Sequence, residues 1–186
     1  PTMVELTKSD LTTGEELPGA HLKVTDKDGN IVDEWISEKN PHVIKELTVG
    51  KKYTLTETKP ADGFVTSESI DFTVENTAEI QKHEMKDDIT KVQISKTDIT
   101  GDKEIPGAKL TILDKNDQVV ESWTSTDKPH YVEKLPVGNY TLREEQAPKG
   151  FVLTSDVTFE VKDTGEVQTV TMKNDTAKGK IIINKT

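Results

Sequence analysis

The feature that most constrains this chain is an internal repeat of about 88 residues. The stretch VELTKSDLTTGEELPGA at residues 4–20 returns as VQISKTDITGDKEIPGA at residues 92–108, an offset of 88. Beyond a one-residue deletion near Lys51 the offset is 87, so that YTL at residues 53–55 matches YTL at residues 140–142. A repeat of this length indicates a complete folding unit with a small core of its own. We therefore expect two domains, at residues 1–89 and 90–178.

The remaining residues, 179–186, contain the segment KIIINKT. It looks like the opening strand of a third copy, because Ile181, Ile183 and Lys185 repeat the spacing of Val4, Leu6 and Lys8. We expect residues 179–186 to be the first strand of a truncated third repeat or a linker.

Each copy has the pattern of an all-β domain. Short runs rich in Val, Ile, Thr and Tyr alternate with polar residues and are separated by turn-forming pairs such as Pro18-Gly19 and Asp28-Gly29. We predict two tandem immunoglobulin-like β-sandwiches of about seven strands each. The run DKDGN at residues 26–30 hints at a calcium loop, but its counterpart DKNDQ at residues 114–118 lacks the glycine. A hairpin turn is therefore the better interpretation.

Composition excludes several classes of partner and chemistry. With 24 Lys and Arg against 34 Asp and Glu, the net charge is −10, so the chain lacks the basic stripe that nucleic acid requires. No apolar run approaches the roughly 18 residues of a membrane helix, and we expect no membrane partner. The absence of Cys removes disulfides and thiolate chemistry. The four His are scattered without ligand spacing, so we predict no metal site and no cofactor.

Strand parity directs three polar side chains of each copy inward. In the opening strand Val4 and Leu6 face the core, so that Lys8 faces it too. The same arithmetic applies to the strand that begins with YTL and to the last strand of each copy. The inward polar residues are then Lys8, Glu57 and Asp87 in the first copy and Lys96, Glu144 and Asn174 in the second.

Two plain interpretations of these residues compete with a chemical one. An inward Lys near a strand end usually extends its ammonium group to solvent, and a buried Lys–Glu–Asp set can be a salt-bridge network. The recurrence of the set in both copies favours chemistry, since buried charge is costly and seldom stabilises by itself. Burial can leave Lys and Glu neutral, and a neutral amine is a nucleophile. It could form an amide, releasing water with Asp87 and ammonia with Asn174, while the Glu moves protons.

The chain resembles the B-type repeat domains of Gram-positive collagen adhesins and pilins, which are CnaB-type, SpaA or prealbumin-like domains. The resemblance covers nearly the whole chain. Three kinds of segment show the resemblance. They are the lysine strand followed by PGA at residues 18–20 and 106–108, the segments YTLTETKPADGF at 53–64 and YTLREEQAPKGF at 140–151, and TMKND at 171–175. The resemblance implies prealbumin-like sandwiches and autocatalytic intramolecular isopeptide bonds. It places the catalytic role on Glu57 and Glu144 and the crosslinks at Lys8–Asp87 and Lys96–Asn174.

The first copy departs from the family pattern. Asp87 stands where the acceptor is usually Asn, and His83 stands where the second copy has Val170. Lys59-Pro60-Ala61 stands in place of the Ala-Pro pair, which allows this loop to bend differently. The neighbours of the expected site residues, Glu145 and Asp88, are disfavoured by strand parity.

The leading functional hypothesis is a structural stalk module of a bacterial surface adhesin or pilus. Such a module is extracellular, is anchored to the cell wall through regions outside this segment, and has neighbouring repeats of the same chain as partners. The alternative is a ligand-binding adhesin module that contacts a host extracellular protein. It would need an apolar or aromatic patch in one copy only.

A third possibility is an accessory sandwich of a secreted enzyme, without crosslinks. Multi-turnover catalysis is not expected, because the reaction consumes its lysine. Trp35 and Trp123 recur at one strand position, which favours core packing over a role as ligand anchors.

Overall fold

The computed structural model describes residues 1–178, which fold into strands, turns and loops. Within this range no helix is long and apolar enough to cross a membrane. The segment 179–186, including Lys185 and its expected third opening strand, lies outside the described residues.

These residues divide into two compact units, the first built on Pro1–Thr90 and the second on most of the chain that follows. Each unit has seven strands. The first contains β1 (Met3–Asp10), β2 (His21–Asp26), β3 (Ile31–Ile36), β4 (His42–Lys45), β5 (Lys52–Lys59), β6 (Ile70–Thr73) and β7 (Ile80–Asp87). The second contains β8 (Lys91–Asp98), β9 (Lys109–Leu113), β10 (Val119–Thr124), β11 (His130–Glu133), β12 (Gly138–Gln146), β13 (Val157–Val161) and β14 (Val167–Asn174).

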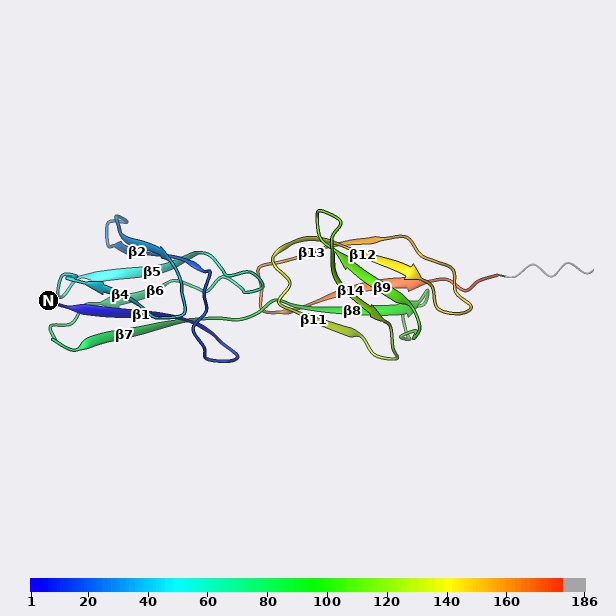
Figure 1. Ribbon diagram of the computed structural model, residues 1–186, viewed down its shortest axis with the longest axis horizontal. Coiled ribbons are helices and arrows are strands. Elements are labelled where there is room, and N and C mark those ends of the chain that lie inside the picture. The colour runs from blue at the N-terminus through cyan, green and yellow to red at the C-terminus, as the bar shows by residue number, and fades with distance from the viewer. Residues whose placement is uncertain (179–186) are drawn as a thin grey trace, which may run out of the picture. The chain divides into compact units, whose positions relative to one another are not determined.

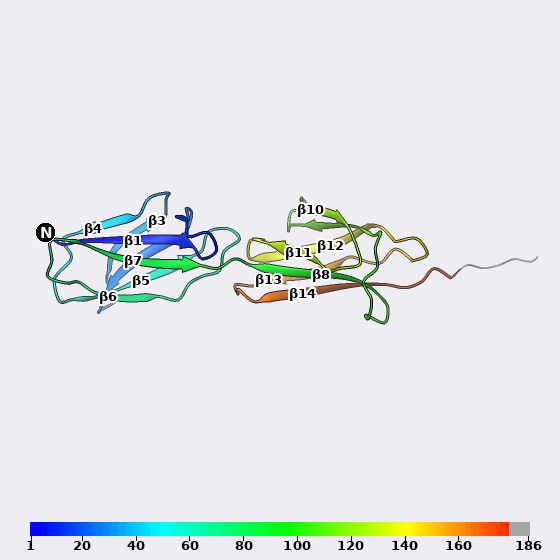
Figure 2. The same cartoon turned by 90° about the horizontal axis from the view of Figure 1, so that it is seen from below.

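Each unit is a sandwich of a three-stranded and a four-stranded sheet (Figure 1). The orders are β4-β1-β7 and β3-β2-β5-β6 in the first unit, and β11-β8-β14 and β10-β9-β12-β13 in the second. The opening and closing strands of each unit are parallel neighbours, β1 with β7 and β8 with β14 (Figure 2). The prediction of two tandem seven-stranded sandwiches is confirmed.

The core of each unit lies between its two sheets. In β1, Val4 and Leu6 are buried, as strand parity predicts. They join one cluster with Leu22 and Leu55, which come from β2 and β5 of the facing sheet. Burying an aliphatic side chain of this size stabilises the fold by roughly 1.5–3 kcal/mol. The alternating apolar residues therefore fix which face of each strand points inward.

The turn between β2 and β3 is a hairpin, which confirms that interpretation of the DKDGN run. Asp26 accepts hydrogen bonds from the backbone N–H groups of Asp28 and Asn30, both at 2.9 Å. Gly29 has a φ of 84°, a left-handed conformation that glycine adopts without strain. Its counterpart Asp117 has a φ of 59°, which Asp tolerates better than most residues.

The loop after β5 bends in the same way as the loop after β12, so the expectation of a different bend is wrong. The N–H of Phe64 donates to the carbonyl of Ala61 at 3.0 Å, and that of Phe151 to the carbonyl of Pro148 at 3.0 Å. The glycine before each phenylalanine has a φ of 85° or 87°. The bend depends on a backbone carbonyl and a left-handed glycine, and both are present whichever residue carries the carbonyl.

Trp35 is half-buried rather than fully in the core. It packs against the core cluster and also stacks on His42, with ring centroids 4.0 Å apart. His42 Nε2 lies 2.8 Å from a carboxylate oxygen of Asp33. Since β3 and β4 are edge strands of opposite sheets, this stack closes one side of the sandwich. The second unit repeats the arrangement with Trp123, His130 and Glu121.

Candidate functional site

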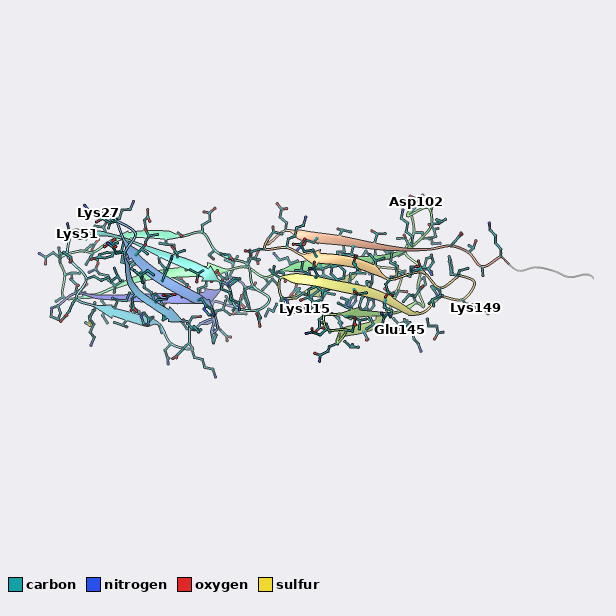
Figure 3. The ribbon with its side chains drawn as sticks, turned by 90° about the horizontal axis from the view of Figure 1, so that it is seen from above. Lys27, Lys51, Asp102, Lys115, Glu145 and Lys149 are labelled. Atoms are coloured by element: carbon teal, nitrogen blue, oxygen red, sulfur yellow. The ribbon has the colours of Figure 1, made fainter. Side chains whose placement is uncertain are left out.

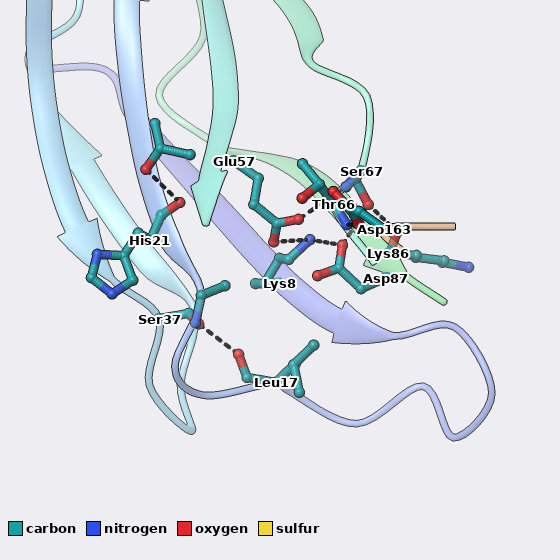
Figure 4. Close-up of polar contacts among 12 residues, drawn as sticks. Lys8, Leu17, His21, Ser37, Glu57, Thr66, Ser67, Lys86, Asp87 and Asp163 are labelled. Carbon is teal, nitrogen blue, oxygen red and sulfur yellow. Dashed lines mark hydrogen bonds and ion pairs between the residues drawn. The ribbon is translucent and has the colours of Figure 1, made fainter. Parts of the chain in front are cut away.

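Three strands of the first unit bring polar side chains together between the sheets (Figure 4). Lys8 comes from β1, Asp87 ends the parallel neighbour β7, and Glu57 comes from β5 in the facing sheet. Their exposed fractions are 2%, 0% and 4%. The register pairs Lys8 with Met85, so that Asp87 lies two residues further along the adjacent strand and faces the same side.

The three groups are in direct contact. Lys8 Nζ contacts Asp87 Oδ1 and lies 2.8 Å from Glu57 Oε2. The backbone N–H of Ser67 donates to Glu57 Oε1 at 2.9 Å. Burial, together with hydrogen bonding to Asp87, raises the pKa of Glu57 to about 7 against the opposing effect of Lys8. This carboxyl can therefore both give and take a proton near neutral pH.

The second unit builds the equivalent site from Lys96 on β8, Glu144 on β12 and Asn174 at the end of β14. Lys96 Nζ lies 3.4 Å from Glu144 Oε1. The Asn174 amide nitrogen donates to both Glu144 oxygens at 3.0 Å and to the carbonyl of Val152 at 2.8 Å. The backbone N–H of Thr154 donates to Glu144 Oε2 at 2.8 Å. The glutamate is thus held by hydrogen bonds beside both other groups.

Two atoms of the second site have unused hydrogen-bonding capacity. Within residues 1–178, neither Lys96 Nζ nor Asn174 Oδ1 makes a hydrogen bond, although both are buried. Burial lowers the pKa of Lys96, and the nearby Glu144 only partly offsets this. A buried lysine with a lowered pKa gives up its proton more readily and becomes a nucleophile. The site therefore holds an amine and an amide carbonyl, both buried and unsatisfied.

All six inward polar residues predicted from strand parity are buried in the structure, three in each unit. Glu145, the neighbour of Glu144, is exposed instead and lies on the outside of its unit (Figure 3). The roles of the six in a crosslink stay a prediction.

Sequence reasoning missed the backbone donors of Ser67 and Thr154 and the carbonyl of Val152. Ser67 and Thr154 each stand three residues after the Gly-Phe pair, and this common spacing could have identified them.

The described part of the chain, residues 1–178, contains no group of three His, Asp or Glu side chains that could hold a metal ion. In the first site both carboxyl groups are in contact with the Lys8 nitrogen.

Comparison with known proteins identifies the family to which the chain belongs. A family model described as the SpaA prealbumin-like fold domain matches residues 2–89 and again 90–176. The Bacillus anthracis TIE protein is 30% identical with a TM-score of 0.57, over 94% of this chain and 34% of that one, so the chain spans about a third of its length. The C-terminal fragment of the pilus adhesin SpaC from Lactobacillus rhamnosus GG has the same fold, at 14% identity, a TM-score of 0.51 and coverage of 97% and 99%. No match was found among curated proteins. Since the family model accounts for both units, the chain belongs to the SpaA prealbumin-like fold domain family.

Proposed function

We propose that each unit forms one intramolecular isopeptide bond, Lys8 to Asp87 and Lys96 to Asn174, and that the crosslinked pair is a stalk module of a bacterial surface adhesin or pilus. The observation that carries the proposal is the contact between the Lys8 amine and the Asp87 carboxyl in a buried site. A glutamate carboxyl lies 2.8 Å from the same nitrogen.

In the first unit the reaction is a condensation. The neutral amine of Lys8 attacks Cγ of Asp87, a C–N bond forms, a C–O bond breaks and one water leaves. Glu57 gives a proton to the departing oxygen and takes one from the nitrogen, so that its own protonation state is restored. Its pKa of about 7 suits it to both transfers.

In the second unit the leaving group is ammonia. The Lys96 amine attacks Cγ of Asn174, and the bond to the amide nitrogen breaks. Glu144 protonates that nitrogen and accepts a proton from Lys96. The hydrogen bonds of 3.0 Å between Glu144 and the Asn174 nitrogen place the acid at the atom that departs. Each lysine is consumed, so each unit turns over once and is not an enzyme in the usual sense.

The product is more favourable than the salt-bridge network that is the plain alternative. Separate Lys, Glu and Asp side chains leave charges in a site that excludes water, and burial penalises each of them. An amide bond removes the lysine charge and the acceptor carboxylate together. The glutamate can then hydrogen-bond to a neutral group.

Intact mass tests the crosslinks. The folded wild type should be lighter than its sequence by one water and one ammonia. Lys8→Ala should lose only ammonia, and Lys96→Ala only water, because each variant lacks one nucleophile. A wild type with the full sequence mass contradicts both bonds, and a variant with the wild-type loss contradicts the assignment of its own domain.

The stalk role is supported by the repeat and by the surface that repeats with it. Most exposed apolar side chains of one unit recur at the equivalent position of the other, whereas a patch made for one ligand needs to be present only once. The recurring pairs are Leu11 and Ile99, Ile31 and Val119, Val32 and Val120, Val43 and Tyr131, Val49 and Val137, and Ile80 and Val167. We place the module outside the cell, at the bacterial surface, with neighbouring repeats as its partners.

Pulling on the two ends of the chain tests the stalk role separately. Under a steadily increasing force the wild type should stretch only slightly, with both units folded, and its force–extension curve should show no unfolding steps. The Lys8→Ala and Lys96→Ala variants should each show one unfolding step. A wild type that unfolds in two steps would contradict the proposal that the module resists tension.

A further inference from the structure

The lysine strand of the first unit loses one of its neighbouring strands before it reaches the lysine. β4 pairs with β1 only from Met3 to Leu6, so this edge of β1 has no strand beside it at Lys8. On the other edge β7 continues alongside β1 as far as Asp10. Lys8 is buried, and a buried peptide group without a partner costs free energy. The backbone of Lys8 therefore needs a second partner from elsewhere in the unit.

The segment that leads into the PGA turn takes the place of the missing strand. Glu16 forms an antiparallel bridge with Ser9, and the N–H of Leu17 donates to the carbonyl of Lys8 at 2.7 Å. The N–H of Lys8 hydrogen-bonds the side-chain carboxyl of Glu16. Both backbone groups of the lysine are therefore held by two consecutive residues of one loop.

The second unit repeats this arrangement. The N–H of Lys96 donates to Glu104 Oε2 at 2.9 Å, and the N–H of Ile105 donates to the carbonyl of Lys96 at 2.7 Å. Thr97 forms the corresponding bridge with Glu104. The segments GEELPGA at residues 14–20 and DKEIPGA at residues 102–108 share this glutamate, although the two residues before it differ. The same side-chain contact is thus made in both copies.

A buried serine that follows β3 fixes the loop in turn (Figure 4). The Ser37 hydroxyl donates to the carbonyl of Leu17 at 2.6 Å and accepts from the N–H of Ala20 at 2.9 Å. In the second unit Ser125 makes the same two bonds, at 2.7 Å and 2.9 Å. Each loop is therefore tied to the lysine strand on one side and to the end of a strand of the facing sheet on the other.

We propose that Glu16 and Glu104 are positioning residues for the two crosslinks, each holding the backbone of its lysine so that the amine stays within reach of the acceptor. The proposal rests on the isopeptide function proposed above. A lysine side chain is long and flexible, and fixing its backbone keeps the amine near the atom that it attacks. Proton transfer stays with Glu57 and Glu144, because Glu16 and Glu104 act through the lysine backbone.

The test is a time course of bond formation in the full chain, made by cell-free synthesis and quenched in denaturant. Intact mass follows the loss of water from the first domain and the loss of ammonia from the second. Glu104→Ala should slow ammonia loss about tenfold, the scale of one hydrogen bond, and leave water loss unchanged. Glu16→Ala should slow water loss and leave ammonia loss unchanged, so that each domain is the control for the other.

Two further variants separate positioning from a general loss of stability. Glu104→Gln keeps a side-chain oxygen that can accept from the Lys96 N–H, and it should react at close to the wild-type rate. Val161→Ala removes buried methyl groups where Val161 pairs with Gly138, at the other end of β12 from Glu144. It should lower the melting temperature of the second domain without slowing ammonia loss. Rates are compared at a temperature at which circular dichroism shows every variant folded.

The inference is overturned if Glu104→Ala reacts at the wild-type rate or slows both reactions equally. It is also overturned if Glu104→Gln is as slow as Glu104→Ala, or if Val161→Ala slows ammonia loss to the same extent. A wild type that never loses ammonia refutes the crosslink itself, which is a different result from a wild type that reacts and a variant that reacts equally fast.

Discussion

Replacing Lys96 with methionine would remove the proposed second crosslink and leave little else disturbed. Methionine is about as long as the lysine stem and carries no charge, so no orphaned ammonium is left in the core. Glu144 keeps the N–H of Thr154 at 2.8 Å and the amide of Asn174 at 3.0 Å. The change in stability should therefore report mainly on the covalent bond.

The size of the effect on stability follows from the length of the loop that the proposed bond would close. Lys96 and Asn174 are 78 positions apart (174 minus 96). By the chain-entropy relation for crosslinks, a loop of this length lowers the free energy of folding by about 4.5 kcal/mol through the unfolded state. In a domain of this size each kcal/mol shifts the melting temperature by about 4–8 °C. We expect Lys96→Met to lower the melting temperature of the second unit by roughly 20–35 °C.

Differential scanning calorimetry measures the shift, and intact mass on the same sample confirms that ammonia is no longer lost. Glu145→Gln is the matched control, because this exposed carboxyl is next to Glu144 in sequence. The variant should lose the same water and ammonia relative to its own sequence mass and should melt at the wild-type temperature. If Lys96→Met abolishes the ammonia loss and yet the second unit melts within a few degrees of wild type, the crosslink does not stabilise the fold by constraining the unfolded chain.

Three further changes test other parts of the structure. His83→Val, which introduces the residue found at Val170, should stabilise the first unit because His83 Nε2 is buried without a hydrogen bond in the described structure. Burial lowers the pKa of His83, so the wild type loses stability as pH falls through that lowered value. The increase in the free energy of unfolding that His83→Val gives, measured with urea, should therefore be larger at acid pH. An equal increase at every pH would contradict this reasoning. His42→Ala should lower the free energy of unfolding of the first unit by about 1 kcal/mol, because it removes the ring stacked on Trp35. The loss of this cover should also shift the fluorescence of Trp35 to the red, and an unchanged spectrum would count against the stack. Bond formation in the first unit should slow as pH rises through about 7, where Glu57 loses its proton, and quenched time courses that show faster water loss above that pH would refute its role as the acid.

Alternation along a strand made the candidate site predictable. Once Val4 and Leu6 are placed in the core, Lys8 must follow, and the same reasoning fixes Glu57 and Asp87. The repeat then supplied a second, independent instance of each position. Inward orientation depends only on backbone geometry and on which residues are apolar, and both can be read along the chain.

The rest of the site lies in loops, where no such period applies. Ser67 and Val152 reach the buried groups from the segments that follow the Gly-Phe turns, and the path of those segments depends on tertiary contacts. The error about the loop at Ala61 has the same origin, because its bend uses a backbone carbonyl that residue identity does not reveal. Sequence parity also could not show that Trp35 would be shared between the core and His42.

The position of the proposed bond determines which part of the first unit would bear tension. Because β1 and β7 are parallel, the chain enters the unit at the start of β1 and leaves it at the far end of β7. Pulling on the two ends would slide these strands past each other and load every hydrogen bond between them. A bond from Lys8 to Asp87 joins the strands near the exit, so that force passes from β1 through the amide and out beyond Asp87. The residues between Lys8 and Asp87, which are 79 positions apart, would then lie outside the path of the force, so that the core between them would carry no tension.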